Sequence, residues 1–227
     1  DVLRPAGHAA IDGRIRWVQK HENGMELVSS YGILSIHPIA PELIRVTFGA
    51  EERRKEMQTE AGYAVRWNSR ETRDVVQIWT EAIVMQIEKS SGAISFFDRE
   101  KRLLLAERKM EPRQIERNGK RRVWNFFAWE RNEKVAAKGF LKGERLPLKH
   151  TAKYISYGTK SKKFPCVMSD KGYGLLPVAD NTVLCCNIPM YGPYLCMEET
   201  EVSDYFFFIG QNETELIKIY DIVIKNF

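Results

Sequence analysis

The residue types that most often carry enzyme chemistry are sparse and scattered in this sequence. None of the histidines forms a His-x-x-x-His or His-Glu-x-x-His pair, the spacing that places two zinc ligands on one helix face. These histidines are His8, His21, His37 and His150. The sequence also lacks a Gly-x-Ser-x-Gly elbow, a phosphate-binding loop and a Gly-x-Gly-x-x-Gly fingerprint. It therefore predicts no catalytic residue, no metal site and no cofactor.

The acidic residues and the glycine cluster favour structural roles. Glu198, Glu199 and Asp204 flank a predicted strand, which is typical of a solvated edge or an interdomain contact. No pair of carboxylates has environments that would separate two pKa values for acid and base work. Gly172-Tyr173-Gly174 precedes a strand and lacks the helix N-terminus that binds phosphate. We interpret it as a tight turn with a small residue beneath a packed aromatic ring.

The cysteines indicate a reducing environment. All four lie in the last third of the chain, at Cys166, Cys185, Cys186 and Cys196. No signal peptide precedes them, and the adjacent pair suits neither a disulfide framework nor a zinc knuckle. The sequence predicts reduced, buried thiols in a cytoplasmic protein.

Basic and aromatic residues offer two further chemistries. The formal net charge is +5, and the basic run 117–122 precedes Trp124, Phe126 and Phe127. Cations interleaved with aromatic rings can bind single-stranded nucleic acid, but these rings fall on both faces of a strand, as a core and an interface require.

Sugars also stack on aromatic faces. Five tryptophans lie in or beside predicted strands, and the pattern places most of them in the core or at interfaces: Trp17, Trp67, Trp79, Trp124 and Trp129.

Short alternating strands dominate the chain, which has 227 residues and 44% hydrophobic content. No stretch of about 18 apolar residues could span a membrane. Repeated strands separated by turn signals predict an all-β sandwich or barrel. The clearest strands cover residues 14–18, 25–29, 32–37, 43–48, 76–80, 83–88, 93–97, 103–105, 123–129, 153–157, 164–168, 173–178, 182–187 and 204–209.

Other segments break this pattern. Residues 1–13 are poorly patterned. Residues 51–60 form a charged run that predicts a solvated loop or a single exposed turn. Between residues 108 and 122 the apolar content is low around Asn118-Gly119, which predicts a long mobile hairpin or loop. Asn212 and Glu215 form a capping-box variant that predicts a C-terminal helix over 211–227. That helical pattern reaches Phe227 without a glycine or proline terminator, so we expect the natural polypeptide to continue. We treat residues 1–227 as one β-sandwich domain.

Four segments, in order, resemble the N-terminal domain of glycoside hydrolase family 31. Residues 32–48 are similar to its early strand pair, residues 79–107 to its next four strands, residues 164–176 to its proline-led strand and Lys-Gly-Tyr-Gly turn, and residues 204–220 to the strand and helix before the catalytic barrel. The resemblance implies a galactose-mutarotase-like antiparallel β-sandwich with a short C-terminal helix. It also implies that the two catalytic aspartates belong to a (β/α)8 barrel beyond Phe227.

The resemblance further implies a non-catalytic domain of an α-glucosidase or α-xylosidase. Its partners are then the barrel of the same polypeptide and an α-linked oligosaccharide substrate. In several relatives a loop from this sandwich lines the substrate pocket, and the matching residues here are Tyr157, Gly158 and Thr159. Relatives that contact sugar there can use a carboxylate, whereas residues 154–164 contain none.

Two other classes of function stay open from the sequence. One is a free-standing carbohydrate-binding or aldose-epimerase-like sandwich, for which His37 and His150 are the candidate in-sheet donors. The other is a nucleic-acid-binding module, which predicts salt-dependent binding to single strands through residues 120–122. We expect no membrane partner, and the sequence leaves a homo-oligomer open.

Overall fold

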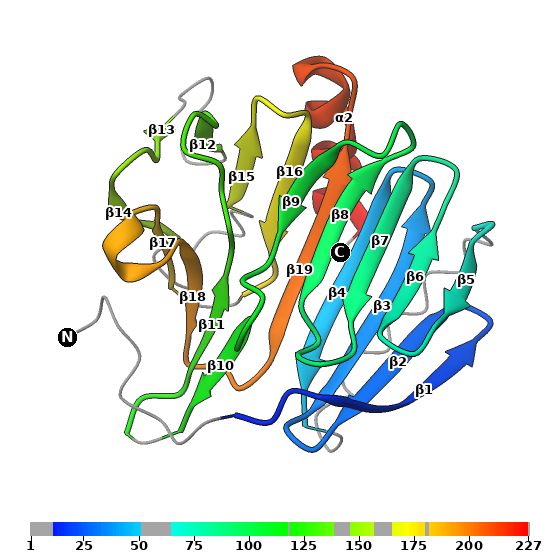
Figure 1. Ribbon diagram of the computed structural model, residues 1–227. Helices are drawn as coiled ribbons and strands as arrows, with labels where there is room; N and C mark the ends of the chain where they lie inside the picture. Colours follow the sequence, from blue (N-terminus) through cyan, green and yellow to red (C-terminus); the bar gives the residue numbers. More distant parts are fainter. Residues whose placement is uncertain are drawn as a thin grey trace.

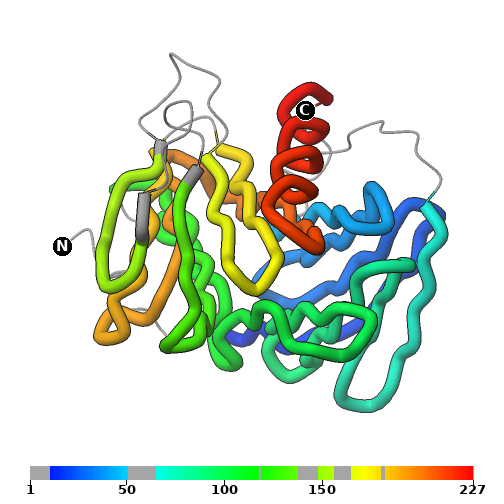
Figure 2. The backbone as a smooth tube through the Cα atoms, turned by 90° about the horizontal axis from the view of Figure 1, so that it is seen from above, coloured from blue at the N-terminus to red at the C-terminus, as the bar shows by residue number. Residues whose placement is uncertain are grey.

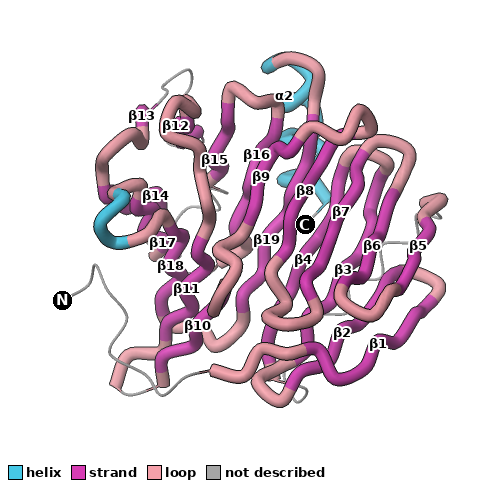
Figure 3. Tube along the Cα trace, viewed as in Figure 1, coloured by secondary structure: helices cyan, strands magenta, loops and turns pink. Residues whose placement is uncertain are grey.

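The computed structural model describes residues 11–50, 65–117, 119–138, 146–156, 165–179 and 182–226. Among these residues the strands form three antiparallel sheets (Figures 1 and 3). The large sheet has the order β1 (Ile15–His21), β2 (Gly24–Ser29), β3 (Ile33–Ala40), β4 (Leu43–Gly49), β19 (Ser203–Ile209), β16 (Tyr173–Pro177), β15 (Cys166–Ser169), β12 (Val135–Lys138) and β13 (Leu146–Pro147).

Two five-stranded sheets complete the strand arrangement, and we name each by its central strand. The β7 sheet consists of β5 (Asn68–Glu71), β6 (Val75–Trp79), β7 (Ile83–Glu88), β8 (Ile94–Asp98) and β9 (Leu103–Ala106). The β18 sheet has the order β10 (Arg113–Glu116), β11 (Arg122–Phe126), β18 (Tyr194–Glu198), β17 (Val183–Cys186) and β14 (Ala152–Ser156). A short 3-10 helix, η2 (Pro189–Tyr191), joins β17 to β18.

The main core lies between the large sheet and the two smaller sheets. One continuous cluster of buried side chains includes Phe207 of the large sheet, Phe96 of the β7 sheet and Met197 of the β18 sheet. The rings of Phe96 and Phe207 stack with their centroids 4.0 Å apart. Because side chains alternate between the faces of a strand, period-two patterning supplies this shared inner face. The predicted all-β sandwich is confirmed, with one of its two layers divided into two sheets.

The helix α2 (Glu213–Asn226) covers part of the opposite face of the large sheet, as Figure 2 shows. Leu216, Ile219 and Val223 are its buried residues, and they belong to the same apolar cluster as Phe206 and Phe208 of β19. Successive residues of β19 therefore pack alternately against the main core and against the helix. This double burial explains why the run from Phe206 to Phe208 is entirely apolar.

The predicted capping interactions begin this helix. The backbone N–H of Glu215 donates to Oδ1 of Asn212 at 3.0 Å, and the Glu215 carboxylate accepts from the N–H of Gln211 at 2.8 Å. The two side chains satisfy backbone donors that the first helical turn leaves unpaired. No helix among the described residues is long and apolar enough to cross a bilayer.

The glycine cluster has the structure that the sequence predicted. Gly172 adopts a φ of 88° in the turn between β15 and β16, in the region that favours glycine. A Cβ atom on Gly174 would lie 2.3 Å from the ring of Phe208. Gly174 therefore lets the helix-facing ring of β19 lie directly over β16.

Of the two predictions for residues 108–122, a hairpin or a loop, the hairpin is confirmed. Within residues 108–122, four residues form β10 and pair with β11, from Arg113 opposite Asn125 to Glu116 opposite Arg122. Apolar content is low there because charged and amide side chains occupy buried positions and contact one another, which sequence periodicity does not reveal. The predicted loop at 51–60 and residues 1–10 lie outside the described residues.

Candidate functional site

The loop that the family resemblance assigns to the substrate pocket joins the two layers of the sandwich. Tyr157, Gly158 and Thr159 themselves lie outside the described residues. The chain leaves the β18 sheet at the end of β14 and re-enters the large sheet at β15. The assignment of these residues to a sugar subsite stays a prediction.

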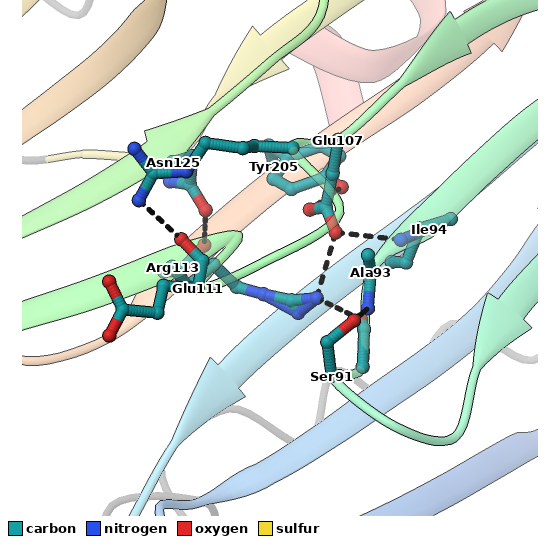
Figure 4. Close-up of polar contacts among 11 residues, drawn as sticks. Ser91, Ala93, Ile94, Glu107, Glu111, Arg113, Asn125 and Tyr205 are labelled. Atoms are coloured by element: carbon teal, nitrogen blue, oxygen red, sulfur yellow. Dashed lines mark hydrogen bonds and ion pairs between the residues drawn. The ribbon is translucent and has the colours of Figure 1, made fainter. Parts of the chain in front are cut away.

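A buried ion pair lies where the three sheets meet (Figure 4). Glu107 follows β9, and its carboxylate is 2.8 Å from Nη2 of Arg113 at the start of β10. The side chains are 0% and 3% exposed, respectively. The same carboxylate accepts hydrogen bonds from the backbone N–H of Ile94 at 2.9 Å and from the hydroxyl of Tyr205 at 3.1 Å. Nη2 of Arg113 also donates to the carbonyl of Gly92.

A second polar contact connects the same layers. The hydroxyl of Ser203, at the start of β19, donates to Oδ1 of Asn125 in β11 at 2.7 Å. Both residues are fully buried. The Asn125 amide nitrogen has no hydrogen-bond partner among the described residues. Together with the ion pair, this contact joins the β18 sheet to the large sheet and to the β7 sheet.

The electrostatics of this cluster favour a structural role. Burial raises the pKa of Glu107, and Arg113 opposes that shift by favouring the carboxylate. Burial also raises the pKa of Tyr205 well above its usual range, with Glu107 adding to the increase. A hollow of about 290 Å³ is lined by Arg113, Tyr31 and Phe48, but Glu107 does not line it. The buried acid instead contacts Arg113 and Tyr205, and these contacts hold the sheets together.

A row of polar side chains crosses the outer face of the large sheet. Arg45 of β4 binds Asp204 of β19 through two hydrogen bonds, of 2.9 and 2.6 Å. Nε2 of His21 is 3.1 Å from the carboxylate of Glu26. His37 lies in the field of Arg45, Glu26 and Asp204, and burial is the largest cause of its lowered pKa. His37 therefore has the carboxylates of Glu26 and Asp204 in its surroundings, which sequence patterning did not reveal.

The structure does not bring the two candidate histidines together. His37 belongs to β3, whereas His150 lies on an exposed turn after β13, the far edge strand of the large sheet. His150 has a φ of 54°. The prediction of His150 as an in-sheet donor is therefore wrong, whereas His37 does lie in the sheet, six strand positions away from β13.

Sequence reasoning also missed the buried acid Glu133. Glu133, in the loop before β12, accepts a hydrogen bond from Oγ of Ser169 at 2.5 Å and another from the hydroxyl of Tyr173. The run from Glu130 to Lys134 looks like a solvated loop, so only the strand pairing of β12 with β15 reveals this contact. No group of three or more His, Cys, Asp or Glu residues in the described part of the chain could hold a metal ion.

These observations define a β-sandwich braced by buried polar contacts. No protein-family model matches the sequence, and no curated protein matches it. Solved structures do match the fold. A GH31 α-xylosidase from a soil metagenome, solved with xylose, superimposes with a TM-score of 0.67 at 18% identity, over 88% of this chain and 33% of that enzyme.

Two further solved structures give the same picture. The GH31 dextranase of Flavobacterium johnsoniae, solved with isomaltotriose, matches with a TM-score of 0.73 at 15% identity, over 94% of this chain and 28% of its own. The cycloalternan-forming enzyme of Listeria monocytogenes, solved with a pentasaccharide, matches with a TM-score of 0.73 at 14% identity, over 93% and 22%. The predicted resemblance to a family 31 sandwich is confirmed for the fold, and the chain spans a third or less of these enzymes' lengths.

Proposed function

We propose that this chain is the non-catalytic β-sandwich domain of a larger α-glycosidase related to family 31. The observation that carries the proposal is the asymmetry of the structural matches. They cover 88–94% of this chain but only 22–33% of the enzymes. In the proposed protein a (β/α)8 barrel of the same polypeptide hydrolyses an α-glucosidic or α-xylosidic bond, and this sandwich supports the barrel.

The exposed side of α2 is the surface that we propose for the barrel. Ile217 and Ile222 are 38% and 54% exposed there, although large apolar side chains are mostly buried in this fold. A groove of about 560 Å³ runs along the helix and is lined by Ile222, Ile219 and Leu104. Its rim carries charges of both signs, including Arg99 and Glu215. An apolar floor with a charged rim is typical of an interface between domains.

The loop containing Tyr157, Gly158 and Thr159 is the segment that we propose contributes to the substrate pocket. Its support is the family resemblance, together with its position between the last described residue of β14 and the start of β15. A cytoplasmic location is part of the same proposal, since the four cysteines are buried and unpaired. In the longer protein, Tyr157→Ala should raise KM for an oligosaccharide more than it lowers kcat if this loop binds substrate.

The test compares this chain with the same chain extended through the following coding sequence. Both are assayed for hydrolysis of 4-nitrophenyl α-glucoside and α-xyloside, and we expect activity only in the extended protein. Ile222→Asp should lower the thermal stability of the extended protein and leave that of the 227-residue chain unchanged. Met190→Asp is the control, because Met190 is 70% exposed in η2, away from the helix. Hydrolysis by the short chain alone would overturn the proposal.

The alternative is a free-standing carbohydrate-binding or epimerase-like sandwich. The observation in its favour is the position of His37 beside Glu26 and Asp204. Mutarotation of glucose and galactose is measured by polarimetry with the 227-residue chain and with its His37→Ala and His150→Ala variants. Turnover that either substitution abolishes would favour this alternative, whereas absence of turnover would count against its epimerase form.

A further inference from the structure

The outer face of the β7 sheet carries two parallel rows of side chains. In one row, Trp79 of β6 is opposite Val84 of β7, and Val84 is opposite Phe97 of β8. In the next row on the same face, Gln77 is opposite Gln86. All five side chains are partly exposed, while the residues that alternate with them along β6, β7 and β8 are buried in the main core. The face is therefore an apolar aromatic row beside an amide row.

These rows line a hollow of about 520 Å³, together with Arg99 and Lys101 of the turn after β8. None of the described residues forms a hydrogen bond with the Gln77 amide or the Trp79 indole N–H. The Gln86 amide has one long contact, 3.4 Å, with the carboxylate of Glu88. The hollow thus has aromatic and aliphatic surfaces together with donors and acceptors that have few partners in the described part of the chain.

This combination suits a saccharide. A pyranose ring presents an apolar C–H face that stacks on an aromatic ring, and hydroxyl groups at its rim that pair with amides and guanidinium groups. Strands lie about 4.8 Å apart, so two rings separated by one intervening strand are about 9.6 Å apart. Trp79 and Phe97 have this relation. Two rings this far apart contact separate units of an extended sugar chain better than they enclose one compact ligand.

The position of this face keeps it accessible in the proposed larger protein. The β7 sheet packs against the inner face of the large sheet, and α2 packs against the outer face. Figures 1 and 2 show the β7 sheet and the helix on opposite sides of the molecule. A barrel that docks on α2 would therefore leave the rows of the β7 sheet uncovered.

We infer that the outer face of the β7 sheet is a saccharide-binding surface for a neutral α-linked oligosaccharide, separate from any catalytic pocket. Trp79 and Phe97 stack against sugar rings, and Gln77 and Gln86 bind hydroxyl groups. The choice of an α-linked sugar rests on the proposed function. The surface would hold a polymeric substrate close to the enzyme while the chemistry takes place elsewhere.

The test is affinity electrophoresis of the 227-residue chain through gels containing dextran or soluble starch, with maltohexaose and isomaltohexaose titrations followed by tryptophan fluorescence. We expect saturable binding that 0.5 M NaCl leaves unchanged, since a neutral ligand has no charge to screen. Trp79→Ala should weaken binding about tenfold or more. Trp17→Ala is the control, because Trp17 is 60% exposed but lies in β1 of the large sheet.

A second variant removes the amides and keeps the rings. The double substitution Gln77→Ala and Gln86→Ala should also weaken binding about tenfold. It tests the site even if Trp79→Ala fails to fold. Absence of binding, binding that salt abolishes, or binding that neither variant changes would overturn the inference. So would a dimer in analytical ultracentrifugation that Trp79→Ala dissociates, with no response to sugar.

The outcomes also separate this inference from the proposed function. Sugar binding by the 227-residue chain, with no hydrolysis by the extended protein, would support the surface and count against the glycosidase. Hydrolysis by the extended protein, with no binding to the β7 sheet, would overturn the surface alone.

Discussion

Replacing Arg113 by methionine isolates the buried carboxylate of Glu107 while keeping most of the side-chain volume. In the native protein this carboxylate has one charged partner, Nη2 of Arg113 at 2.8 Å, and two neutral donors, Ile94 and Tyr205. Its side chain is fully buried, so water cannot replace the lost partner. Breaking a buried pair by removing one charge costs about 3–5 kcal/mol, because the remaining ion is left uncompensated.

Urea denaturation at pH 7 measures this cost. A loss of about 3–5 kcal/mol lowers the midpoint by about 1.5–2.5 M if the m-value is about 2 kcal/mol/M. Arg102→Met is the matched control, because Arg102 pairs with Asp98 at 2.6 Å but its side chain is 76% exposed. Exposed pairs contribute less than about 1 kcal/mol. Equal losses for Arg113→Met and Arg102→Met would refute the assignment of Glu107 and Arg113 as a brace.

The pH dependence gives the same prediction a second measurement. Burial raises the pKa of Glu107 in the folded state, so the folded protein binds this proton more tightly than the unfolded chain does. Stability therefore falls as pH rises from the ordinary glutamate pKa through the raised value. Without Arg113 the pKa of Glu107 rises further. The loss of unfolding free energy caused by Arg113→Met should therefore be larger at about pH 8 than at about pH 4.5. Adding Glu107→Gln should recover most of the loss.

Three further predictions concern packing and cysteine chemistry. Leu216→Ala should cost about 2–5 kcal/mol in urea denaturation by opening a cavity beneath α2, whereas exposed Ile222→Ala should change stability by less than about 0.5 kcal/mol. Gly174→Ala should cost about 1–3 kcal/mol and lower Tm, because its Cβ would meet the ring of Phe208; an unchanged Tm would contradict this. Burial raises the pKa of the Cys185 thiol, so Ellman's reagent at pH 8 should react with it only after unfolding.

The main strands could be predicted from sequence because apolar residues recur along the whole inner face of each strand. The alternation in β6, β7 and β8 places one apolar side chain inward at every second residue, and the structure places the same residues in the core. The capping residues Asn212 and Glu215 gave the start of α2 for an equally local reason. Signals of this kind depend on neighbouring residues and need no knowledge of strand order.

The polar contacts could not be predicted because they depend on strand order. Glu107 and Arg113 are six positions apart in a segment of low apolar content, and their third partner, Tyr205, is 98 positions from Glu107. Asp204 reaches Arg45 across 159 positions of sequence. Single-sequence patterns assign such residues to solvent, which is where most charged side chains lie.

All three sheets have aromatic side chains on their outer faces, but these side chains differ in how far they are buried. This difference supports the inferred binding surface. On the β18 sheet, Trp124 and Tyr194 lie with ring centroids 4.8 Å apart and are fully buried. On the large sheet, the outward ring of Phe206 packs in the cluster beneath α2. On the β7 sheet, Trp79 and Phe97 are only partly buried. Outward aromatic residues that folding has already covered contribute stability, whereas rings that stay accessible beside the amides of Gln77 and Gln86 can contribute binding energy to a ligand.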